Sequence, residues 1–489
     1  SVAGESVAYV SCQRDREVAV VDLASTRVVR RIPVGGQPAK MALNRGASRL
    51  FVANANSDSV SVVALPSGTV QAELSTAPRG AEGLLGSNPN DAAISEDQRT
   101  LYVTNGGNNS LAVFALSDAD RGVPGGPPGP SRLLGLVPTG FYPNAVTAGP
   151  GRFLYVAHGK SPTGPNRFGP WTDVPRSAVD PYVQNAGNAY SLQLMRGGLL
   201  AFPVPDADAL AKLTRQVLQN NRAESPATEP DVFRALRGKV KHVVYVIGEN
   251  RTYDQILGDL PGADGDPALV HWGEPITPNH HALAREFVTL DRFFDSGGVS
   301  GDGWQWSTSG RSTDVAEKAV PVEYAERGVR SYDWEGKSRN VNVAFSTPAG
   351  RAWANPRTPT SPDLLPGPGD VAGVDEPDVG GRGFLWDAAL AAGVSVRNYG
   401  FFIDDSRYGF LFGNPRGIPP LARPFEAGVP VAFATRPSLL PITDPYFRGF
   451  DLNVADVWRV LEWEREFDRY VASGELPGLE LVRLPHDHL

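Results

Sequence analysis

Residues 245–254 read YVIGENRTYD, and this stretch joins an apolar strand to a helix. The strand, residues 243–247, stops abruptly at Glu249 and Asn250, and a helical pattern begins near Tyr253. Open α/β sheets place their ligand groups where a strand ends and a helix follows. The stretch therefore predicts an α/β domain with its chemistry at Glu249 and Asn250, whose oxygen donors suit a divalent cation.

The same order of elements continues toward the C-terminus. We predict strands at 243–247, 288–294 and 394–403 and helices at 253–257, 278–287, 303–310, 384–392 and 454–473. Alternating strands and helices are typical of an α/β sandwich with a largely parallel sheet.

A second informative stretch, residues 290–308, reads LDRFFDSGGVSGDGWQWST. Ser300 stands where the Gly-rich turn meets the predicted helix, and the free N–H groups and dipole of a helix start favour an anion. A hydroxyl in that place, next to a cation, can act as a nucleophile in phosphoryl transfer. Plainer interpretations are that Ser300 is a helix N-cap and that Glu249 complements a helix dipole.

The N-terminal part of the chain repeats a three-part pattern. Short strands at 8–11, 50–54, 101–105 and 154–157 are followed by second strands, the fourth after a long insertion at 159–198. A proline-containing segment precedes the next unit, as in residues 36–39, 88–91 and 142–145. The period, about 40–54 residues, is typical of propeller blades. A helix is predicted at 206–222.

Composition narrows the classes of function. The 489 residues exceed what one core usually holds, so at least two domains are expected. The net charge of -8 and the lack of a dense Lys/Arg tract disfavour binding of nucleic acid or an anionic membrane. No apolar run reaches the ~18 residues of a membrane span. The single cysteine, Cys12, excludes an intramolecular disulfide and a thiolate metal cage.

The repeats resemble the YVTN family of β-propellers, because residues 102–105 read YVTN and strand, turn and proline segments recur in order. The resemblance implies an N-terminal all-β propeller over residues 1–220, with about four or five blades recognisable. A linker at 221–237 and an alkaline-phosphatase-like α/β domain at 238–489 are expected to follow. The partner of the propeller stays open.

The Glu249–Asn250 pair and Ser300 together resemble the phosphoesterase family of the alkaline phosphatase superfamily, which includes bacterial phospholipases C and acid phosphatases. The resemblance implies a metal-dependent hydrolase of phosphoric esters, either a phosphatase or a phospholipase C-like enzyme, located outside the cytoplasm. Ser300 would be its nucleophile, and Glu249 and Asn250 would bind a divalent metal ion of unknown identity. The substrate would be a small phosphate ester or a lipid headgroup.

Two departures from that family are visible. Phospholipase members place Pro-Asn-Arg just after the nucleophile, whereas Asp302, Gly303 and Trp304 stand here, so Arg251 or Gln305 would have to bind the substrate instead. Family members also carry a later Asp-Asp or Asp-His cluster, of which Asp487 and His488 are a candidate start, so we expect a truncated chain. Asp487 and His488 are therefore two further candidates for substrate binding.

Two other functions are compatible with parts of the sequence. One is a non-catalytic binding or surface module that is inactive as this fragment. The other is a sulfatase or phosphonate hydrolase of the same superfamily. Known sulfatases need Cys or Ser in a Cys/Ser-x-Pro-x-Arg setting, and residues 300–304, SGDGW, do not match it.

Overall fold

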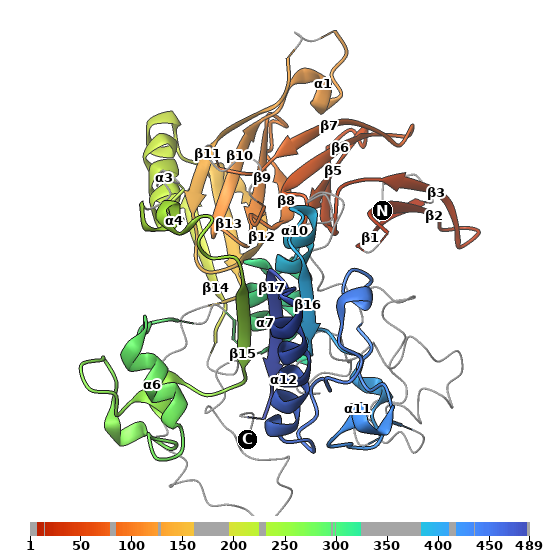
Figure 1. Ribbon diagram of the computed structural model, residues 1–489. Helices are drawn as coiled ribbons and strands as arrows, with labels where there is room; N and C mark the ends of the chain where they lie inside the picture. Colours follow the sequence, from red (N-terminus) through yellow and green to blue (C-terminus); the bar gives the residue numbers. More distant parts are fainter. Residues whose placement is uncertain are drawn as a thin grey trace, which may run out of the picture. The chain divides into compact units, whose positions relative to one another are not determined.

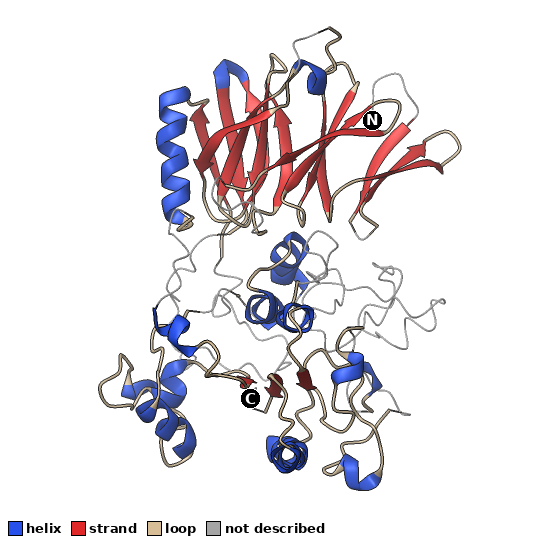
Figure 2. Ribbon diagram, turned by 45° about the horizontal axis from the view of Figure 1, so that its top comes forward, coloured by secondary structure: helices blue, strands red, loops and turns tan. Residues whose placement is uncertain are grey.

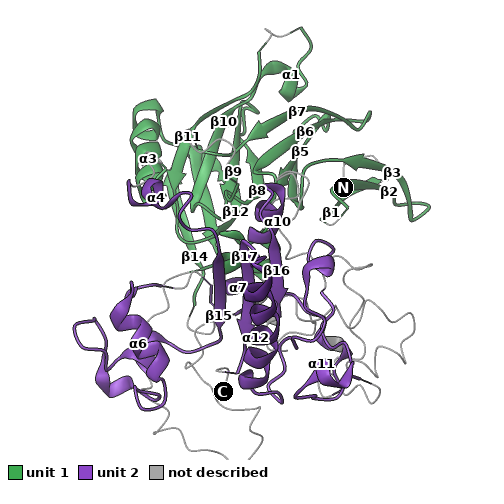
Figure 3. Cartoon of the chain, viewed as in Figure 1, with its two compact units in different colours: residues 1–229, 305–322, 371–384 green, residues 230–304, 323–370, 385–489 purple. Residues whose placement is uncertain are grey.

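The structure is a computed structural model, which describes residues 7–13, 15–78, 85–125, 129–160, 195–223, 231–294, 297–298, 300–323, 383–409, 417–434 and 436–486. The chain divides into two compact units (Figure 3). Unit 1 comprises Ser1–Glu229, Gln305–Val322 and Val371–Phe384, and unit 2 comprises Pro230–Trp304, Glu323–Asp370 and Leu385–Leu489. The first boundary falls inside the segment 221–237.

Unit 1 contains four antiparallel sheets in succession along the chain (Figure 1). The sheets consist of β1 (Val7–Cys12), β2 (Glu17–Asp22) and β3 (Arg27–Pro33); β4 (Pro38–Leu43), β5 (Arg49–Asn54), β6 (Ser59–Ala64) and β7 (Thr69–Ser75); β8 (Pro89–Ile94), β9 (Thr100–Asn105), β10 (Ser110–Ala115) and β11 (Arg132–Pro138); and β12 (Pro143–Gly149), β13 (Phe153–His158) and β14 (Gly198–Pro203).

Consecutive sheets pack face to face. Alternate residues of a strand point to opposite faces, so one strand can contribute to the cores on both sides of its sheet. In β9, Leu101 and Val103 belong to the core shared with the second sheet, whereas Tyr102 belongs to the core shared with the fourth. Strand β10 divides in the same way, with Phe114 on one side and Val113 on the other. Sheets buried on both faces are the arrangement of propeller blades.

The pairing register repeats from sheet to sheet. A bulge separates Val20 from Val21 in β2, Val62 from Val63 in β6, and Val113 from Phe114 in β10. The bulge lies after the fourth residue of each strand, so the repeat in the sequence is also a repeat in backbone geometry. Four described sheets of this kind form a β-propeller-like domain.

The remaining elements of unit 1 include the helix predicted at 206–222. Helix α3 (Ala207–Asn220) starts at Asp206, whose side chain accepts the Ala209 N–H at 2.8 Å. It lies alongside β11 (Figure 2). Its Val217 belongs to the same core as Leu136 of that strand. Short elements are α1 (Asp118–Arg121) and η1 (Pro150–Arg152). Most of the predicted insertion, residues 161–194, lies outside the described residues.

Unit 2 is built on a parallel sheet, as expected. Its described strands are β15 (Val243–Gly248), β17 (Leu479–Leu484) and β16 (Val396–Tyr399), in that spatial order. Strand β16 is shorter than the predicted 394–403. The central strand, β17, did not figure among the predicted strands.

The predicted strand at 288–294 is wrong. Those residues form turns and irregular structure, and Val288 and Phe294 are 89% and 84% exposed. A strand needs a neighbour for its backbone N–H and C=O groups, and the apolar composition of this stretch does not provide one.

The helices of unit 2 match the sequence more closely. They are α4 (Asp231–Leu236), α5 (Tyr253–Leu257), α6 (Pro278–Glu286), α10 (Leu385–Ala391), α11 (Pro424–Ala427) and α12 (Asp456–Ser473), with 3-10 turns η3 (Pro267–Leu269), η6 (Asp405–Arg407) and η8 (Leu440–Ile442). Helix α7 (Ser300–Ser309) begins at Ser300 and not at 303, and belongs to unit 2 up to Trp304 and to unit 1 from Gln305. Helix α8 (Asp314–Glu323) follows. Among the described helices none is long and apolar enough to cross a lipid bilayer.

Candidate functional site

Glu249 lies directly after β15, at the carboxyl edge of the parallel sheet of unit 2. Its backbone N–H donates to Leu484 O at 3.1 Å, which extends the pairing of β15 with β17 by one residue. The Glu249 side chain is 6% exposed. A buried carboxylate needs hydrogen-bond donors, and the surrounding elements provide them.

Ser300 provides the first donor. Its Oγ donates to Glu249 Oε1 at 2.5 Å, so two residues that are 51 positions apart in the sequence are in direct contact. Trp304 Nε1 donates to Glu249 Oε2 at 3.3 Å. Residues i and i+4 share one face of a helix, and α7 therefore presents Ser300 and Trp304 to the same carboxylate.

Arg483 provides the positive charge. Its Nη2 lies 2.9 Å from Glu249 Oε2, and the Arg483 side chain is 1% exposed. The guanidinium also stacks over the Trp304 ring, 4.2 Å from the centroid, and Trp304 in turn contacts Phe401 edge to face. The rings of Trp304 and Phe401 shield this ion pair from water, and the contact with Phe401 holds the Trp304 ring in place.

Arg251 lies in a groove of about 390 Å³ in unit 2. The groove is lined by Arg251, Ile256, Trp272, Ile276, Thr277, Pro278, Asn279, His280 and His486. The Arg251 guanidinium stacks over the Trp272 ring at 4.2 Å. Because Arg251 follows β15 and His486 follows β17, the groove opens at the edge of the sheet that also carries Glu249.

The other predicted site residues are placed differently. Asn250 is exposed. Gln305 is fully buried on α7 and does not line the groove. Asp487 and His488 lie outside the described residues. The structure thus brings Ser300 and Glu249 together and sets Arg251 in a groove. The roles of all seven predicted site residues stay predictions.

The hydrogen-bond donors around Glu249 bear on the predicted metal site. Both of its oxygens already accept protein donors, one of them a guanidinium. In the described parts of the chain, the groups of three or more His, Cys, Asp or Glu able to share one ion reduce to Cys12, Asp15 and Glu17 in the β1–β2 hairpin. The described residues near Glu249 do not complete a metal site, so we derive no chemical step through a metal.

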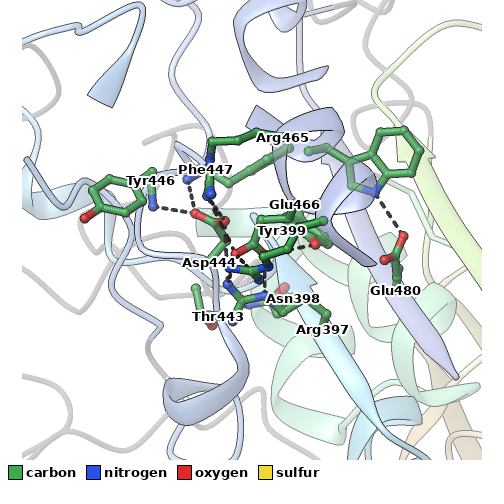
Figure 4. Close-up of polar contacts among 12 residues, drawn as sticks. Arg397, Asn398, Tyr399, Thr443, Asp444, Tyr446, Phe447, Arg465, Glu466 and Glu480 are labelled. Carbon is green, nitrogen blue, oxygen red and sulfur yellow. Dashed lines mark hydrogen bonds and ion pairs between the residues drawn. The ribbon is translucent and has the colours of Figure 1, made fainter. Parts of the chain in front are cut away.

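A second charged cluster joins β16 and α12 inside unit 2 (Figure 4). Arg397 donates to Glu466 through Nε at 2.7 Å and Nη2 at 2.9 Å, and Arg465 Nη2 lies 3.2 Å from Asp444. Arg465 contacts Asp444 Oδ2, and the backbone N–H of Tyr446 donates to Asp444 Oδ1 at 2.6 Å. Two buried carboxylates are thereby held together by two partly exposed guanidinium groups.

The pKa values of the two carboxylates in this cluster are shifted in opposite directions. Burial raises the pKa of Asp444 to about 7, and repulsion by Glu466 adds to the increase. Burial also opposes ionisation of Glu466, but the hydrogen bonds and charge of Arg397 outweigh it and lower the pKa of Glu466. One proton is therefore held on Asp444 at mildly acidic pH.

No protein-family model matches the chain, and no curated protein matches it either. Solved structures with partial similarity include Kuenenia stuttgartiensis hydrazine synthase, with 25% identity over 32% of this chain and 39% of that chain, at a TM-score of 0.26. A Pseudomonas aeruginosa periplasmic gluconolactonase has 22% identity over 31% and 43%, at a TM-score of 0.27. A putative 6-phosphogluconolactonase from Bacteroides uniformis has 15% identity over 32% and 45%, at a TM-score of 0.27. The chain spans less than half of each of these structures.

Proposed function

We propose that the chain hydrolyses phosphoric esters with Ser300 as the nucleophile. The observation that supports this function is the 2.5 Å hydrogen bond from Ser300 Oγ to Glu249 Oε1. A nucleophilic hydroxyl must lie within hydrogen-bond reach of the group that takes its proton. The similarity of both motifs to the phosphoesterase family points to phosphorus as the atom attacked.

In the proposed reaction Ser300 Oγ forms a bond to phosphorus as its proton passes to Glu249. The P–O bond to the leaving alcohol breaks, and the alcohol oxygen keeps the electron pair and takes up a proton. Water then cleaves the phosphoserine, releases phosphate and restores the Ser300 hydroxyl. The first turn of α7 presents backbone N–H groups that favour the negative charge of the phosphoryl group.

Arg251 is the proposed substrate contact. A guanidinium is always charged and donates in a planar fork that matches phosphate oxygens. The groove around Arg251 also has an aromatic and aliphatic wall, which fits a small phosphate ester or the headgroup of a lipid. A comparison of para-nitrophenyl phosphate with its choline ester separates monoester from diester hydrolysis.

The experiment is to trap the phosphoserine. The protein is incubated with para-nitrophenyl phosphate and each of several divalent ions, then quenched in acid, and the peptide containing residue 300 is analysed by mass spectrometry. We expect a mass increase of one phosphoryl group in the wild type and none in Ser300→Ala. Ser309→Ala, a change in the same helix, is the matched control and should keep the modification. Equal hydrolysis by wild type and Ser300→Ala would remove Ser300 from the mechanism.

The alternative is a non-catalytic module. The buried ion pair between Glu249 and Arg483 favours this alternative. A carboxylate paired in this way can simply join the ends of β15 and β17 without taking part in a reaction. This alternative predicts no release of para-nitrophenol with any divalent ion. It also predicts that Ser300→Ala changes only the free energy of unfolding.

A further inference from the structure

Residues 311–318, RSTDVAEK, form a largely buried part of unit 1 that we call the docked segment. Arg311 and Asp314 are 7% and 1% exposed, so their charged groups depend on protein partners. Helix α8 begins at Asp314, and Thr313 Oγ1 accepts the Ala316 N–H at 3.3 Å, as an N-cap does. The sheets of the same unit supply partners to this segment.

The start of the docked segment contacts the second and third sheets of unit 1. Arg311 Nη2 donates at 2.8 Å to Oδ1 of Asn56, which follows β5. Asn88, which directly precedes β8, donates through Nδ2 to Ser312 O at 3.0 Å. The first bond depends on the arginine side chain, whereas the second holds the backbone whatever the side chain of residue 312.

The carboxylates of the docked segment contact the third and fourth sheets. Asp314 Oδ1 accepts the Asn90 side-chain amide of β8 at 3.1 Å and the hydroxyl of Tyr142, just before β12, at 2.8 Å. Lys160, two residues beyond β13, forms an ion pair with Glu317. Burial, followed by the charges of Asp314 and Glu317, raises the pKa of Tyr142 well above its usual value, so its hydroxyl stays a donor. The contacts therefore progress from the second sheet to the fourth along the segment.

The repeat of unit 1 places two of these partners at corresponding points. Asn88 and Tyr142 each precede the proline that starts the first strand of a sheet, and their φ angles are 51° and 56°. Gln37 precedes the proline of β4 with a φ of 48°. A bulky side chain such as Tyr rarely adopts a positive φ, and such strain persists where the surroundings over-determine it. The contact surface is therefore a product of the repeated sheets.

The recognised charges follow a regular pattern in the sequence. Arg311, Asp314 and Glu317 are spaced three residues apart, and residues i and i+3 of a helix share one face. We propose that unit 1 is a peptide-binding module that recognises arginine, aspartate and glutamate at this spacing, with the docked segment as its tethered ligand. Its partner is a peptide segment with the same charge pattern. This binding function goes beyond the proposed hydrolysis and does not depend on Ser300.

The experiment measures binding of a fluorescein-labelled peptide, residues 307–321 of this sequence, to the full chain by fluorescence anisotropy. A tethered ligand acts at a high effective concentration, so a free peptide competes poorly with it in the wild type. The double change Asp314→Ala with Glu317→Ala weakens the tethered segment and opens the surface to the free peptide. We call this variant the opened chain.

We expect the peptide to bind the opened chain about tenfold more tightly than the wild type. Tyr142→Phe or Lys160→Glu in the opened chain should weaken binding about tenfold, because a hydrogen bond to a charged group is lost. A peptide carrying Glu317→Lys should recover binding to the Lys160→Glu form. Tyr155→Phe in β13 is the matched control and should leave binding unchanged, because no described residue hydrogen-bonds its hydroxyl.

Equally weak binding to the opened chain and the wild type would overturn the proposal, since the segment would then be only a structural part of unit 1. Equal affinity for the original and the Glu317→Lys peptide would overturn recognition of the charge pattern.

A second measurement decides the question if the opened chain does not fold. Hydrogen–deuterium exchange at residues 311–318 is compared in the wild type, in Lys160→Glu, and in Lys160→Glu with Glu317→Lys. We expect faster exchange in the single variant and a return to the wild-type rate in the double variant. Unchanged exchange in the single variant would refute the inference. Neither measurement requires turnover, so the outcome is independent of the proposed function.

Discussion

Arg483 Nη2 lies 2.9 Å from Glu249 Oε2, and both side chains are buried. The ends of β15 and β17 are thus joined by an ion pair in addition to their backbone pairing. Such a pair contributes little net stability compared with apolar residues, but the loss of one partner leaves an uncompensated buried charge. The pair therefore makes the Glu249 position sensitive to any change at residue 483.

We predict that Arg483→Met lowers the free energy of unfolding by about 3–5 kcal/mol, because Glu249 is left buried without its cation. Urea unfolding monitored by tryptophan fluorescence measures this change. The double variant Arg483→Met with Glu249→Gln should recover most of the loss. A single variant as stable as the wild type would show that solvent reaches Glu249.

Part of the candidate site could be predicted from sequence. A strand that ends at Glu249 and a Gly-rich turn that starts a helix at Ser300 place both side chains at a strand–helix junction, and in the structure they touch. These signals are local, since each depends on a few consecutive residues.

Arg483 could not be predicted in the same way. Strand β17 reads LELVRL and carries a charge on each face, with Glu480 beside Trp463 and Arg483 beside Glu249. Alternation of apolar and polar residues identifies half-buried strands, and it fails where both faces are buried and each charge has a partner. The 290–294 stretch misleads in the opposite direction, because Phe293 and Phe294 are apolar but exposed.

Arg251→Ala should raise KM for para-nitrophenyl phosphate about tenfold, corresponding to ~1.4 kcal/mol, with a smaller effect on kcat. The reason is that the guanidinium in the groove binds the ester before and during the reaction. Arg285→Ala is a suitable control, because Arg285 is an exposed cation of α6 paired with Glu274 and is not among the groove residues. An equal rise in KM in both variants would point to a general loss of positive charge.

The pair of His281 and Asp259 predicts a pH-dependent contribution to stability. His281 Nε2 lies 2.8 Å from Asp259 Oδ1, and Nδ1 lies 2.9 Å from Thr277 O, so both ring nitrogens face acceptors. Burial lowers the pKa of His281, but the bonds to Asp259 and Thr277 outweigh it and raise the pKa above 6.5.

Because the folded-state pKa of His281 is raised, its contribution is fully present below the unfolded pKa and is lost as pH rises through the folded pKa. Asp259→Asn should bring the His281 pKa down, which an NMR titration of the imidazole measures directly. The variant should lose more stability at pH 6 than at pH 8. A larger loss at pH 8 would contradict this assignment.

The buried carboxyl group of Asp444 predicts a second pH dependence of stability, in a pH range centred below that of His281. Its pKa is raised to about 7 from 3.8, chiefly by burial, so the folded protein binds a proton that the unfolded chain releases. Stability from this group is therefore greatest below pH 3.8 and declines as pH rises from there to about 7. Above that range the Asp444 carboxylate is ionised and buried beside Glu466, with Arg465 Nη2 at 3.2 Å and Arg397 Nη2 at 3.6 Å from its Oδ2.

Asp444→Asn keeps the shape of the protonated carboxyl group and removes the titration. We expect the free energy of unfolding of the variant to change less between pH 5 and pH 8 than that of the wild type. Near pH 8 the variant should be more stable than the wild type. Urea unfolding at several pH values measures the difference in slope. Glu426→Gln is the control, because Glu426 is an exposed carboxylate of α11 that pairs with Arg423. Parallel pH profiles for Asp444→Asn and the wild type would show that Asp444 is already ionised in the folded protein.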